Sequence, residues 1–322
     1  MTNRPEPTIV VGVDGSPGSV RAIRYAAAEA ARTGSRIRLV HAVPDHLPVT
    51  PMLPLLPQDL LDIGSTVLAE ARTAAVARAG AERVEADLVR GGAVPALVAA
   101  SEGAHLVVLG HERRSLVDRL VTGVTVTGVA ARAHCPVLVV PDGADGRLRN
   151  VVVVGVERPT RCREILRHAY DAADRRHAFL RVVHSWEVPS PYQDLVEGRT
   201  ARERWAEQVR SEITPVMDEC RRDWPDVAAD LEVVHGQAAG TLLRMSREAD
   251  LLVLERPHHR MPPHLGSISR ALLQKAGCPV EVVPSGVGLP EPEPLNQQAE
   301  GRIVAPAGAN GNGSDQGSPV DA

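Results

Sequence analysis

Several residue types are scarce in this chain of 322 residues, and each shortage excludes a class of function. Aromatic residues make up 2% of the chain, too few for the stacking platforms that bind single-stranded nucleic acids. Lys275 is the single lysine, which excludes a Walker-type phosphate-binding lysine in the first half and Schiff-base chemistry almost everywhere. The net charge of −4 offers no basic field to nucleic acid or to an anionic membrane.

The chain also lacks the patterns of a metal scaffold, a disulfide scaffold and a membrane protein. Its four cysteines form no C-x-x-C pair. No apolar run approaches the roughly 18 residues of a membrane span, and the polar start at residues 1–7 does not resemble a signal peptide. We therefore expect a cytoplasmic protein that binds neither membranes nor nucleic acids. Cys135 and Cys278 each precede a proline and an apolar run, which favours packed cysteines over reactive thiols.

An internal repeat organises the sequence. The segment IVVGV at 9–13 corresponds to VVVGV at 152–156, and CPVLVVP at 135–141 corresponds to CPVEVVP at 278–284. His41 and His184 have the same spacing of 143 residues. Three landmarks at one spacing predict a duplicated domain. We place the first domain at residues 1–145 and the second at 146–285. The final segment, 286–322, is rich in Gly, Pro, Asn, Gln and Ser and is predicted to be a disordered tail.

Within each copy, short apolar runs alternate with Ala-rich amphipathic stretches. The expected strands are 9–13, 36–41, 84–89, 106–110 and 136–140 in the first copy, and 151–156, 178–184, 229–234, 250–255 and 279–283 in the second. The expected helices are 20–32, 58–78, 161–174 and 199–222, with a further helix opening at Gly123. Ser16 and Pro17 suit the start of the first helix, and Gly34 suits its end. This alternation predicts two α/β domains with doubly wound parallel sheets, whose ligands bind at the carboxyl ends of the strands.

Two glycine-bearing segments lie at those carboxyl ends. Asp14 and Gly15 follow the first strand and precede a helix, whose N–H groups and dipole can face an anion while Asp14 binds a ribose or a metal-bound water. The same residues also suit an ordinary turn between a strand and a helix. Gly110 ends the fourth strand, and Gly123 follows with Thr125 nearby, so backbone and hydroxyl groups there could cradle a phosphate.

Taken together, the segment VGVDGS at 11–16, the glycine and loop after the fourth strand, and the closing CPVLVVP resemble a tandem universal stress protein. The resemblance covers about residues 8–141 and 150–284. It implies a five-stranded parallel sheet in the order 3-2-1-4-5 and dimerisation through the last strand. In this chain it implies that strands 136–140 and 279–283 join the two domains as an intramolecular pseudo-dimer, with a homodimer and unidentified protein partners as further possibilities.

Many members of the family bind ATP through a loop of the form G-x2-G-x9-G-[ST], and others bind no nucleotide. The first copy departs from this form: Arg113 stands at the second glycine, and Val124 stands at the hydroxyl position, with Thr125 one residue later. The adenine contacts of the family fall on backbone at Ala42 and Val43. The resemblance therefore implies a first-copy site for ATP or another adenine nucleotide, with Mg²⁺, made by Asp14, Gly15, Ala42, Val43, Gly110, Arg113, Gly123, Val124 and Thr125.

The second copy departs further from the loop. Glu157 replaces Asp14, Glu255 replaces Gly110, and the segment 256–264 is two residues shorter and has no glycine. Since Glu255 would repel a phosphate, we expect no nucleotide in the second domain. Three histidines of this loop could be read with Glu255 as metal ligands, but a solvated basic loop is favoured because no pair has helical spacing.

Two functions remain open. In the first, the protein is a stress-response module regulated by nucleotide bound to its first domain. In the second, both sites have decayed and the protein is a nucleotide-independent scaffold. No set of nucleophile, base and orienting group emerges from the sequence, so we expect no enzymatic activity. The Pro-rich segment 44–57 is predicted to be a loop that packs its leucines on its own domain.

Overall fold

The computed structural model describes residues 6–44, 57–111, 119–142, 147–187, 191–256 and 265–285. Residues Met1–Ser285 form one compact unit. The predicted tail, most of the Pro-rich segment and the histidine-bearing loop lie outside the described residues, so the predictions made for them stay predictions.

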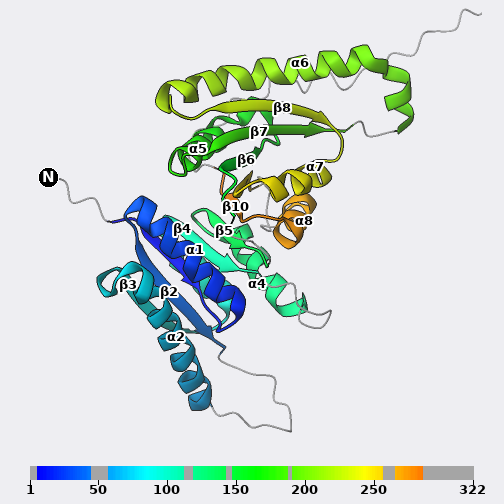
Figure 1. Ribbon diagram of the computed structural model, residues 1–322. Helices are drawn as coiled ribbons and strands as arrows, with labels where there is room; N and C mark the ends of the chain where they lie inside the picture. The colour runs from blue at the N-terminus through cyan, green and yellow to red at the C-terminus, as the bar shows by residue number, and fades with distance from the viewer. Residues whose placement is uncertain are drawn as a thin grey trace, which may run out of the picture. The chain divides into compact units, whose positions relative to one another are not determined.

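Strands and helices alternate along both halves of the chain (Figure 1). The first half contains β1 (Thr8–Gly12), α1 (Pro17–Thr33), β2 (Arg36–Val43), α2 (Pro57–Ala79), β3 (Val84–Arg90), α3 (Ala93–Ala100), β4 (Leu106–Gly110), α4 (Arg119–Arg132) and β5 (Val137–Val140). The second half contains β6 (Val151–Gly155), α5 (Arg163–Asp174), β7 (Phe179–Trp186), α6 (Pro191–Asp223), β8 (Ala229–His235), α7 (Ala238–Met245), β9 (Leu251–Glu255), α8 (Ser267–Lys275) and β10 (Val280–Val283).

All ten of these strands belong to one sheet, in the order β3-β2-β1-β4-β5-β10-β9-β6-β7-β8. Each half therefore has the expected order 3-2-1-4-5 with parallel neighbours, and the predicted fold class is confirmed. The two halves meet where β5 and β10 pair antiparallel, with Val139 opposite Val280 and Leu138 opposite Glu281. The final strands thus join the halves, as the sequence predicted.

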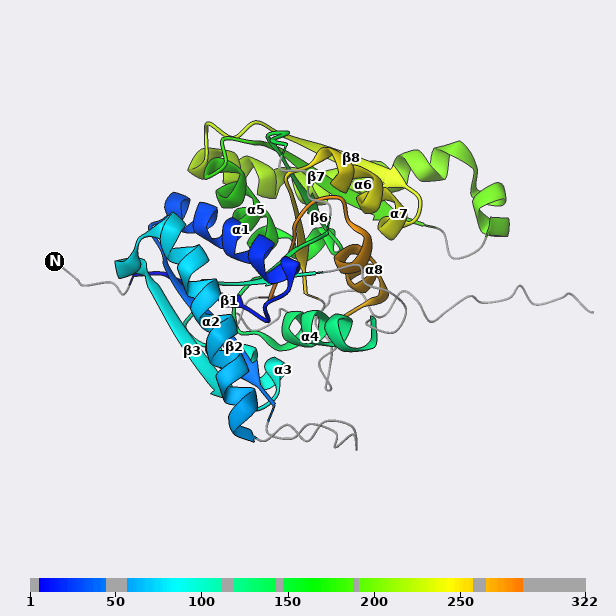
Figure 2. The ribbon, with the colours of Figure 1, turned by 60° about the horizontal axis from the view of Figure 1, so that its bottom comes forward.

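Helices cover both faces of the sheet (Figure 2). One hydrophobic core lies under α1, α2, α5 and α6, and the other lies under α3, α4, α7 and α8. The central strands β1, β4, β6 and β9 are buried on both faces, which explains why they read as continuous apolar runs rather than as alternating ones.

The first helix begins and ends as its sequence predicts. Ser16 is its N-cap, and the Ser16 hydroxyl accepts a hydrogen bond from the Ser19 N–H at 3.2 Å. Gly34 ends the helix in the left-handed region, with φ of 67°, where glycine has no steric penalty. The buried positions of α1 from Ala22 to Ala30 correspond, at the spacing of 143 residues, to the buried positions of α5 from Ile165 to Ala173. The two halves therefore share the way this helix packs on the sheet as well as the sequence repeat.

Three helical predictions differ from the structure. The helix expected to open at Gly123 begins at Arg119, so Gly123 lies inside α4. The helix expected from residue 199 begins at Pro191. The sequence analysis also missed α3, α7 and α8, because helices of eight or nine residues are too short to display a clear period.

Candidate functional site

A cavity of about 210 Å³ lies at the carboxyl ends of β1, β2 and β4, and we call it the first-half cavity. Its lining also comes from four further places: the turn after β1, the start of α1, α3, and the part of α4 around Val126. The lining residues are Gly12, Val13, Asp14, Ser16, Ser19, Val40, His41, Ala42, Ala93, Leu97, Leu109, Gly110, Thr125 and Val126. Four predicted site residues from distant parts of the sequence, Asp14, Ala42, Gly110 and Thr125, therefore meet at one cavity.

Asp14 shapes the turn that opens this cavity. Its Oδ1 accepts a hydrogen bond from the Ser16 N–H at 3.0 Å, and Gly15 between them has a φ of 76° that glycine adopts without strain. The side chain of Asp14 is exposed. Asp14 therefore has a local structural role, and its carboxylate also lies at the mouth of the cavity, where a ligand hydroxyl or a metal-bound water can reach it.

The glycine at the end of β4 is explained by packing. A Cβ added to Gly110 would lie 2.1 Å from the carbonyl oxygen of Gly18, in the first turn of α1. Only glycine allows the helix N-terminus to come this close to the strand end. This contact brings the first N–H groups of α1 to the edge of the cavity. The sequence analysis did not select Gly18. The one sign of its role in the sequence is that a glycine follows Pro17 in the first turn of a helix, where glycine is otherwise unfavourable.

His41 is a lining residue that the sequence analysis did not assign to the site. Its Nδ1 lies 2.7 Å from the carbonyl oxygen of Val13 and donates to it, because a carbonyl can only accept. His184 makes the same contact to Val156 at 2.9 Å in the second half. The repeated histidine therefore holds the carboxyl ends of two neighbouring strands together in both halves.

Three further predicted site residues are not among those that line the cavity. Gly15, Val43 and Val124 do not line it, and the side chain of Val124 is 61% exposed. Gly123 lies within α4, and Arg113 lies outside the described residues.

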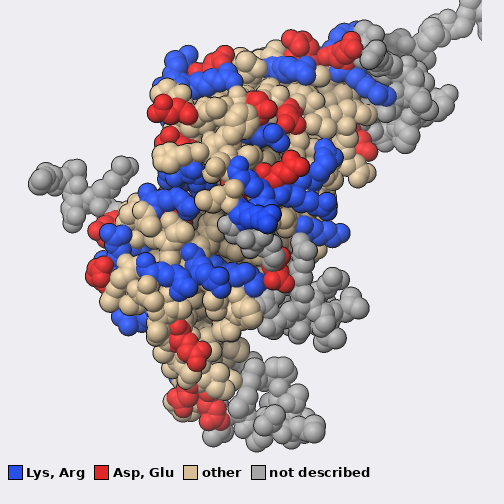
Figure 3. Space-filling model, in the orientation of Figure 1, with Lys and Arg blue, Asp and Glu red and all other residues tan. Residues whose placement is uncertain are grey.

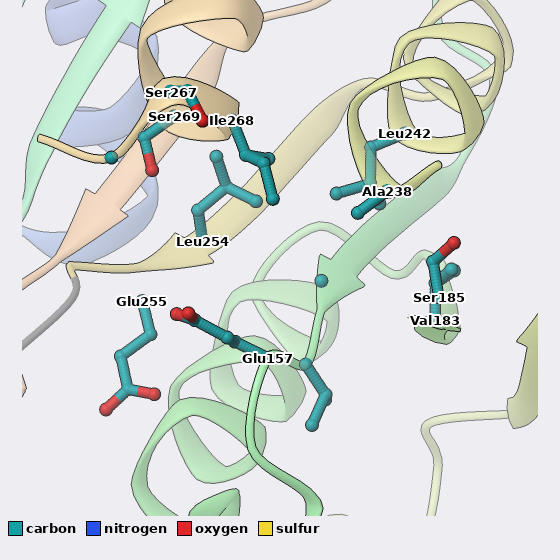
Figure 4. Close-up of a pocket in the computed structure, with 13 residues that line it drawn as sticks. Glu157, Val183, Ser185, Ala238, Leu242, Leu254, Glu255, Ser267, Ile268 and Ser269 are labelled. Atoms are coloured by element: carbon teal, nitrogen blue, oxygen red, sulfur yellow. The ribbon is translucent and has the colours of Figure 1, made fainter. Parts of the chain in front are cut away.

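The second half has a corresponding cavity of about 250 Å³, which we call the second-half cavity (Figure 4). Its lining residues are Gly155, Val156, Glu157, Val183, Ser185, Ala238, Leu242, Leu254, Glu255, Gly266, Ser267, Ile268 and Ser269. In Figure 4 the apolar side chains of Leu242, Leu254 and Ile268 lie on one side, and Glu157 and Glu255 lie on the other.

The two cavities differ most where a phosphate would bind. The pair of glycines at the β4 end, Gly18 and Gly110, is replaced in the second half by Arg161 and Glu255. Glu255 has a side chain only 12% exposed, and it forms an ion pair with Arg158 at 3.6 Å. The second-half cavity is therefore of similar volume, but two large charged side chains, one guanidinium group and one carboxylate, stand where the first half has glycines.

The cysteines contribute no reactive thiol to either cavity. All four are buried. Burial raises the pKa of Cys135 and of Cys278 to about 12, and that of Cys162 to about 11, so each remains a neutral thiol. Within the described residues, no group of three His, Cys, Asp or Glu side chains is arranged to hold a metal ion. The helices in that part of the chain include none with the length and apolar character needed to span a membrane.

Comparisons with known proteins agree with this architecture. The model of the universal stress protein family matches residues 7–141 and again residues 149–284. The universal stress protein Rv2623 of Mycobacterium tuberculosis is 31% identical over 290 residues, covering 85% of this chain and 95% of that protein. The universal stress protein Mb2028c of Mycobacterium bovis is 31% identical over 295 residues, covering 85% and 96%.

A solved structure has the same fold. The crystal structure of a universal stress protein from Archaeoglobus fulgidus has a TM-score of 0.63 and covers 87% of this chain and 96% of its own, at 19% identity.

Proposed function

Since this chain belongs to the universal stress protein family, with two tandem copies of the family domain, we propose that it is a non-enzymatic stress-response module whose first half binds an adenine nucleotide. The observation that carries the proposal is the meeting of Asp14, Ala42, Gly110 and Thr125 at the first-half cavity. These residues come from four separate segments of the chain: the turn after β1, β2, β4 and α4.

The chemistry of the first-half cavity suits the parts of a nucleotide. Ala93, Leu97, Leu109 and Val126 give apolar walls for a base. The N-terminus of α1, brought close by Gly18, supplies N–H groups and a positive dipole end for a phosphate.

The polar residues of the mouth complete the proposed site. Asp14 and Thr125 both line the cavity. Asp14 would accept a hydrogen bond from a ribose hydroxyl or from a water bound to Mg²⁺, and the hydroxyl of Thr125 would donate to a phosphate. Backbone groups around Ala42 would hold the edge of the base. When bound, Mg²⁺ would neutralise part of the phosphate charge.

We propose that the second-half cavity does not take part in nucleotide binding. Glu255 stands where Gly110 stands in the first half and would face the phosphates of any nucleotide bound as proposed there, and its carboxylate would repel them. Arg158 lies 3.6 Å from Glu255 and offsets part of this charge.

The test is calorimetric titration of the full chain with ATP, ADP and AMP in the presence of Mg²⁺, after bound nucleotide has been removed. We expect one nucleotide per chain. Asp14→Ala should weaken binding about ten-fold, the effect of one lost charge-assisted hydrogen bond. Glu157→Ala, the same change at the equivalent position of the second half, should leave the affinity unchanged.

A third variant separates the two roles of Asp14. Asp14→Asn removes the charge but keeps an oxygen that can accept the hydrogen bond from the Ser16 N–H. Weaker nucleotide binding with an unchanged melting temperature would therefore show that Asp14 acts by contacting the ligand and not by stabilising the turn. Equal affinity of wild type and Asp14→Ala would overturn the site, and two nucleotides per chain would overturn the assignment of the second half.

The alternative function is a nucleotide-independent scaffold that uses the same fold. It is favoured by Val124, which is exposed at the position of the family's hydroxyl residue, and by the two glutamates of the second-half cavity. The absence of heat in the titration at millimolar nucleotide would select this alternative.

A further inference from the structure

A third cavity, of about 400 Å³, lies where α1 of the first half meets the second half, and we call it the arginine cavity. Its lining comes from one face of α1, from the end of β5, from residues 147–150, from Arg176, and from the residues just before β9 and β10. Six arginines contribute to it: Arg21, Arg24, Arg32, Arg147, Arg149 and Arg176. The nucleotide proposed above binds elsewhere, so this cavity is independent of that proposal.

Positive charge exceeds negative charge around the arginine cavity. Asp250 is the one carboxylate of the lining, and its oxygens accept hydrogen bonds from the backbone N–H groups of Arg149 and Val151 at 2.8 and 3.2 Å. Two further carboxylates pair with lining arginines: Glu29 with Arg176 and Arg32, and Asp142 with Arg21. The lining itself thus carries six guanidinium groups and one carboxylate, and Arg147 and Arg149 make further contacts of their own.

The surface view agrees with this count. Figure 3 shows Lys and Arg side chains gathered over α1 and along its border with the second half. Because Lys275 is the single lysine of the chain, nearly all of these cations are arginines. Arginine is the side chain best suited to phosphate, since its planar fork can donate two hydrogen bonds to one phosphate group.

Two arginines on α1 have donors available for a ligand. Arg24 is exposed and makes no hydrogen bond or ion pair to any described residue. Arg21 donates through Nη2 to the carbonyl oxygen of His111 at 3.2 Å, while its Nε is buried and has no hydrogen-bond partner in the described part of the chain. A buried donor without a partner is costly, and an anion in the cavity would satisfy it.

The walls of the cavity are fixed by the fold. Arg176 is held by Glu29 at 2.8 Å and by the Tyr25 hydroxyl at 3.1 Å, and its side chain is only 9% exposed. The segment that carries Arg149 is anchored by Asp250. Preorganised donors of this kind need little ordering when a ligand binds.

Comparison of the two halves shows that the basic face of α1 is not required by the fold. Arg21 and Ala28 correspond, at a spacing of 143 residues, to Glu164 and Asp171 on α5. Asp171 pairs there with Arg175. The α5 face is therefore balanced in charge, whereas the described residues of the equivalent α1 face carry arginines without acids except the buried Glu29.

From this geometry we propose that the arginine cavity binds a small molecule with two or more phosphoryl groups. Its volume falls within the roughly 300–1,000 Å³ of small-molecule sites, and Tyr25, Leu148 and Pro279 give it an apolar portion for an organic part of the ligand. The lining arginines come both from α1 and from the second half, so a ligand with two or more phosphoryl groups can contact arginines on both sides of the cavity.

Calorimetric titration of the full chain with inorganic triphosphate tests the proposal. We expect binding at one site, and the variants Arg24→Ala and Arg21→Ala should each weaken it about ten-fold, because each removes a charge-assisted contact. Arg72→Ala is the matched control. Arg72 is exposed on α2, so this substitution removes the same charge at a position away from the cavity. It should leave the affinity unchanged.

A second measurement does not depend on variants. Triphosphate should protect Arg24 from modification by phenylglyoxal, read by mass spectrometry, and should not protect Arg72. The proposal is overturned if triphosphate does not bind. It is also overturned if Arg21→Ala and Arg24→Ala bind triphosphate with wild-type affinity while Asp14→Ala binds it more weakly. Tighter binding of a poly-glutamate peptide than of triphosphate would overturn the ligand class and assign the cavity to an acidic protein segment.

Discussion

Arg176, just after α5 in the second half, donates a hydrogen bond to Glu29 on α1 in the first half at 2.8 Å, and the two side chains are 9% and 3% exposed. Arg32 and Arg175 also lie within ion-pair distance of Glu29, at 3.3 and 3.8 Å. One buried carboxylate therefore pairs with guanidinium groups from both halves. The equivalent position on α5 is Ala172, so this contact exists once in the molecule.

Glu29→Gln should lower the free energy of unfolding by about 3 kcal/mol, because it leaves the buried Arg176 without its counter-charge. Urea unfolding followed by circular dichroism measures the loss. The control is Glu85→Gln, which removes an exposed pair with Arg36 at 2.8 Å and should cost less than about 1 kcal/mol. Equal losses in the two variants would show that Glu29 does not act through its burial.

The imidazole of His168 on α5 and the carboxylate of Glu281 on β10 lie 2.9 Å apart and give the stability of the protein a dependence on pH. Burial by itself lowers the pKa of His168, but the Glu281 carboxylate outweighs it and the pKa is raised above 6.5. Burial by itself raises the pKa of Glu281, but His168, Arg176 and Arg175 outweigh it and the pKa is lowered below 4.5.

The sign of the pH effect follows from these directions. The contribution of His168 is complete below pH 6.5 and is lost as the pH rises through its higher folded pKa. The contribution of Glu281 is complete above pH 4.5 and is lost as the pH falls through its lower folded pKa. The stability difference between wild type and His168→Gln should therefore be largest between pH 4.5 and 6.5 and smaller in alkaline solution. A difference that stays constant from acid to alkaline pH would contradict the prediction.

Gly110→Ala should destabilise the protein by about 2 kcal/mol or more, because its Cβ would lie 2.1 Å from the Gly18 carbonyl and α1 would have to move. Gly240→Ala is the matched control. Gly240 lies in α7 with open space at the Cβ position, so alanine should stabilise the protein by about 0.5–1 kcal/mol. The measurement is the melting temperature of each variant relative to wild type. An unchanged melting temperature for Gly110→Ala would contradict the prediction, because it would mean that α1 can move away from the end of β4 without cost.

The buried thiols should not react in the folded protein. Burial raises the pKa of Cys135, Cys162, Cys220 and Cys278, so the thiolate that attacks a disulfide reagent is scarce at pH 8. We expect almost no release of thionitrobenzoate from a disulfide reagent in native buffer and four equivalents in guanidinium chloride. Rapid release of one equivalent in native buffer would contradict this prediction and would identify a cysteine that becomes exposed by local unfolding.

The strands were predictable because each central one is an uninterrupted apolar run, which the burial of β1 and β4 on both faces requires. The short helices were not predictable. α3 contains Pro95 and has almost no polar residue to mark a face, and α4 continues through Gly123, where glycine suggested a helix start.

The first-half cavity was partly predictable, because the carboxyl ends of parallel strands meet at one edge and Asp14 and Gly110 both end such strands. The packing role of Gly110 was hidden, since it depends on how close α1 comes to β4. The arginine cavity could not be predicted at all. Its lining extends from Arg21 to Pro279, and these residues come together only through the antiparallel pairing of β5 with β10.

That pairing takes place between two strands of one polypeptide, and so it does not depend on protein concentration. In a dimer of identical subunits every substitution appears twice, and the two surfaces that meet must be complementary to themselves. Fusion removes this constraint. Arg21 and its equivalent Glu164 can carry opposite charges, Glu29 can pair with arginines of both halves from one position, and the residues that line the two cavities can differ.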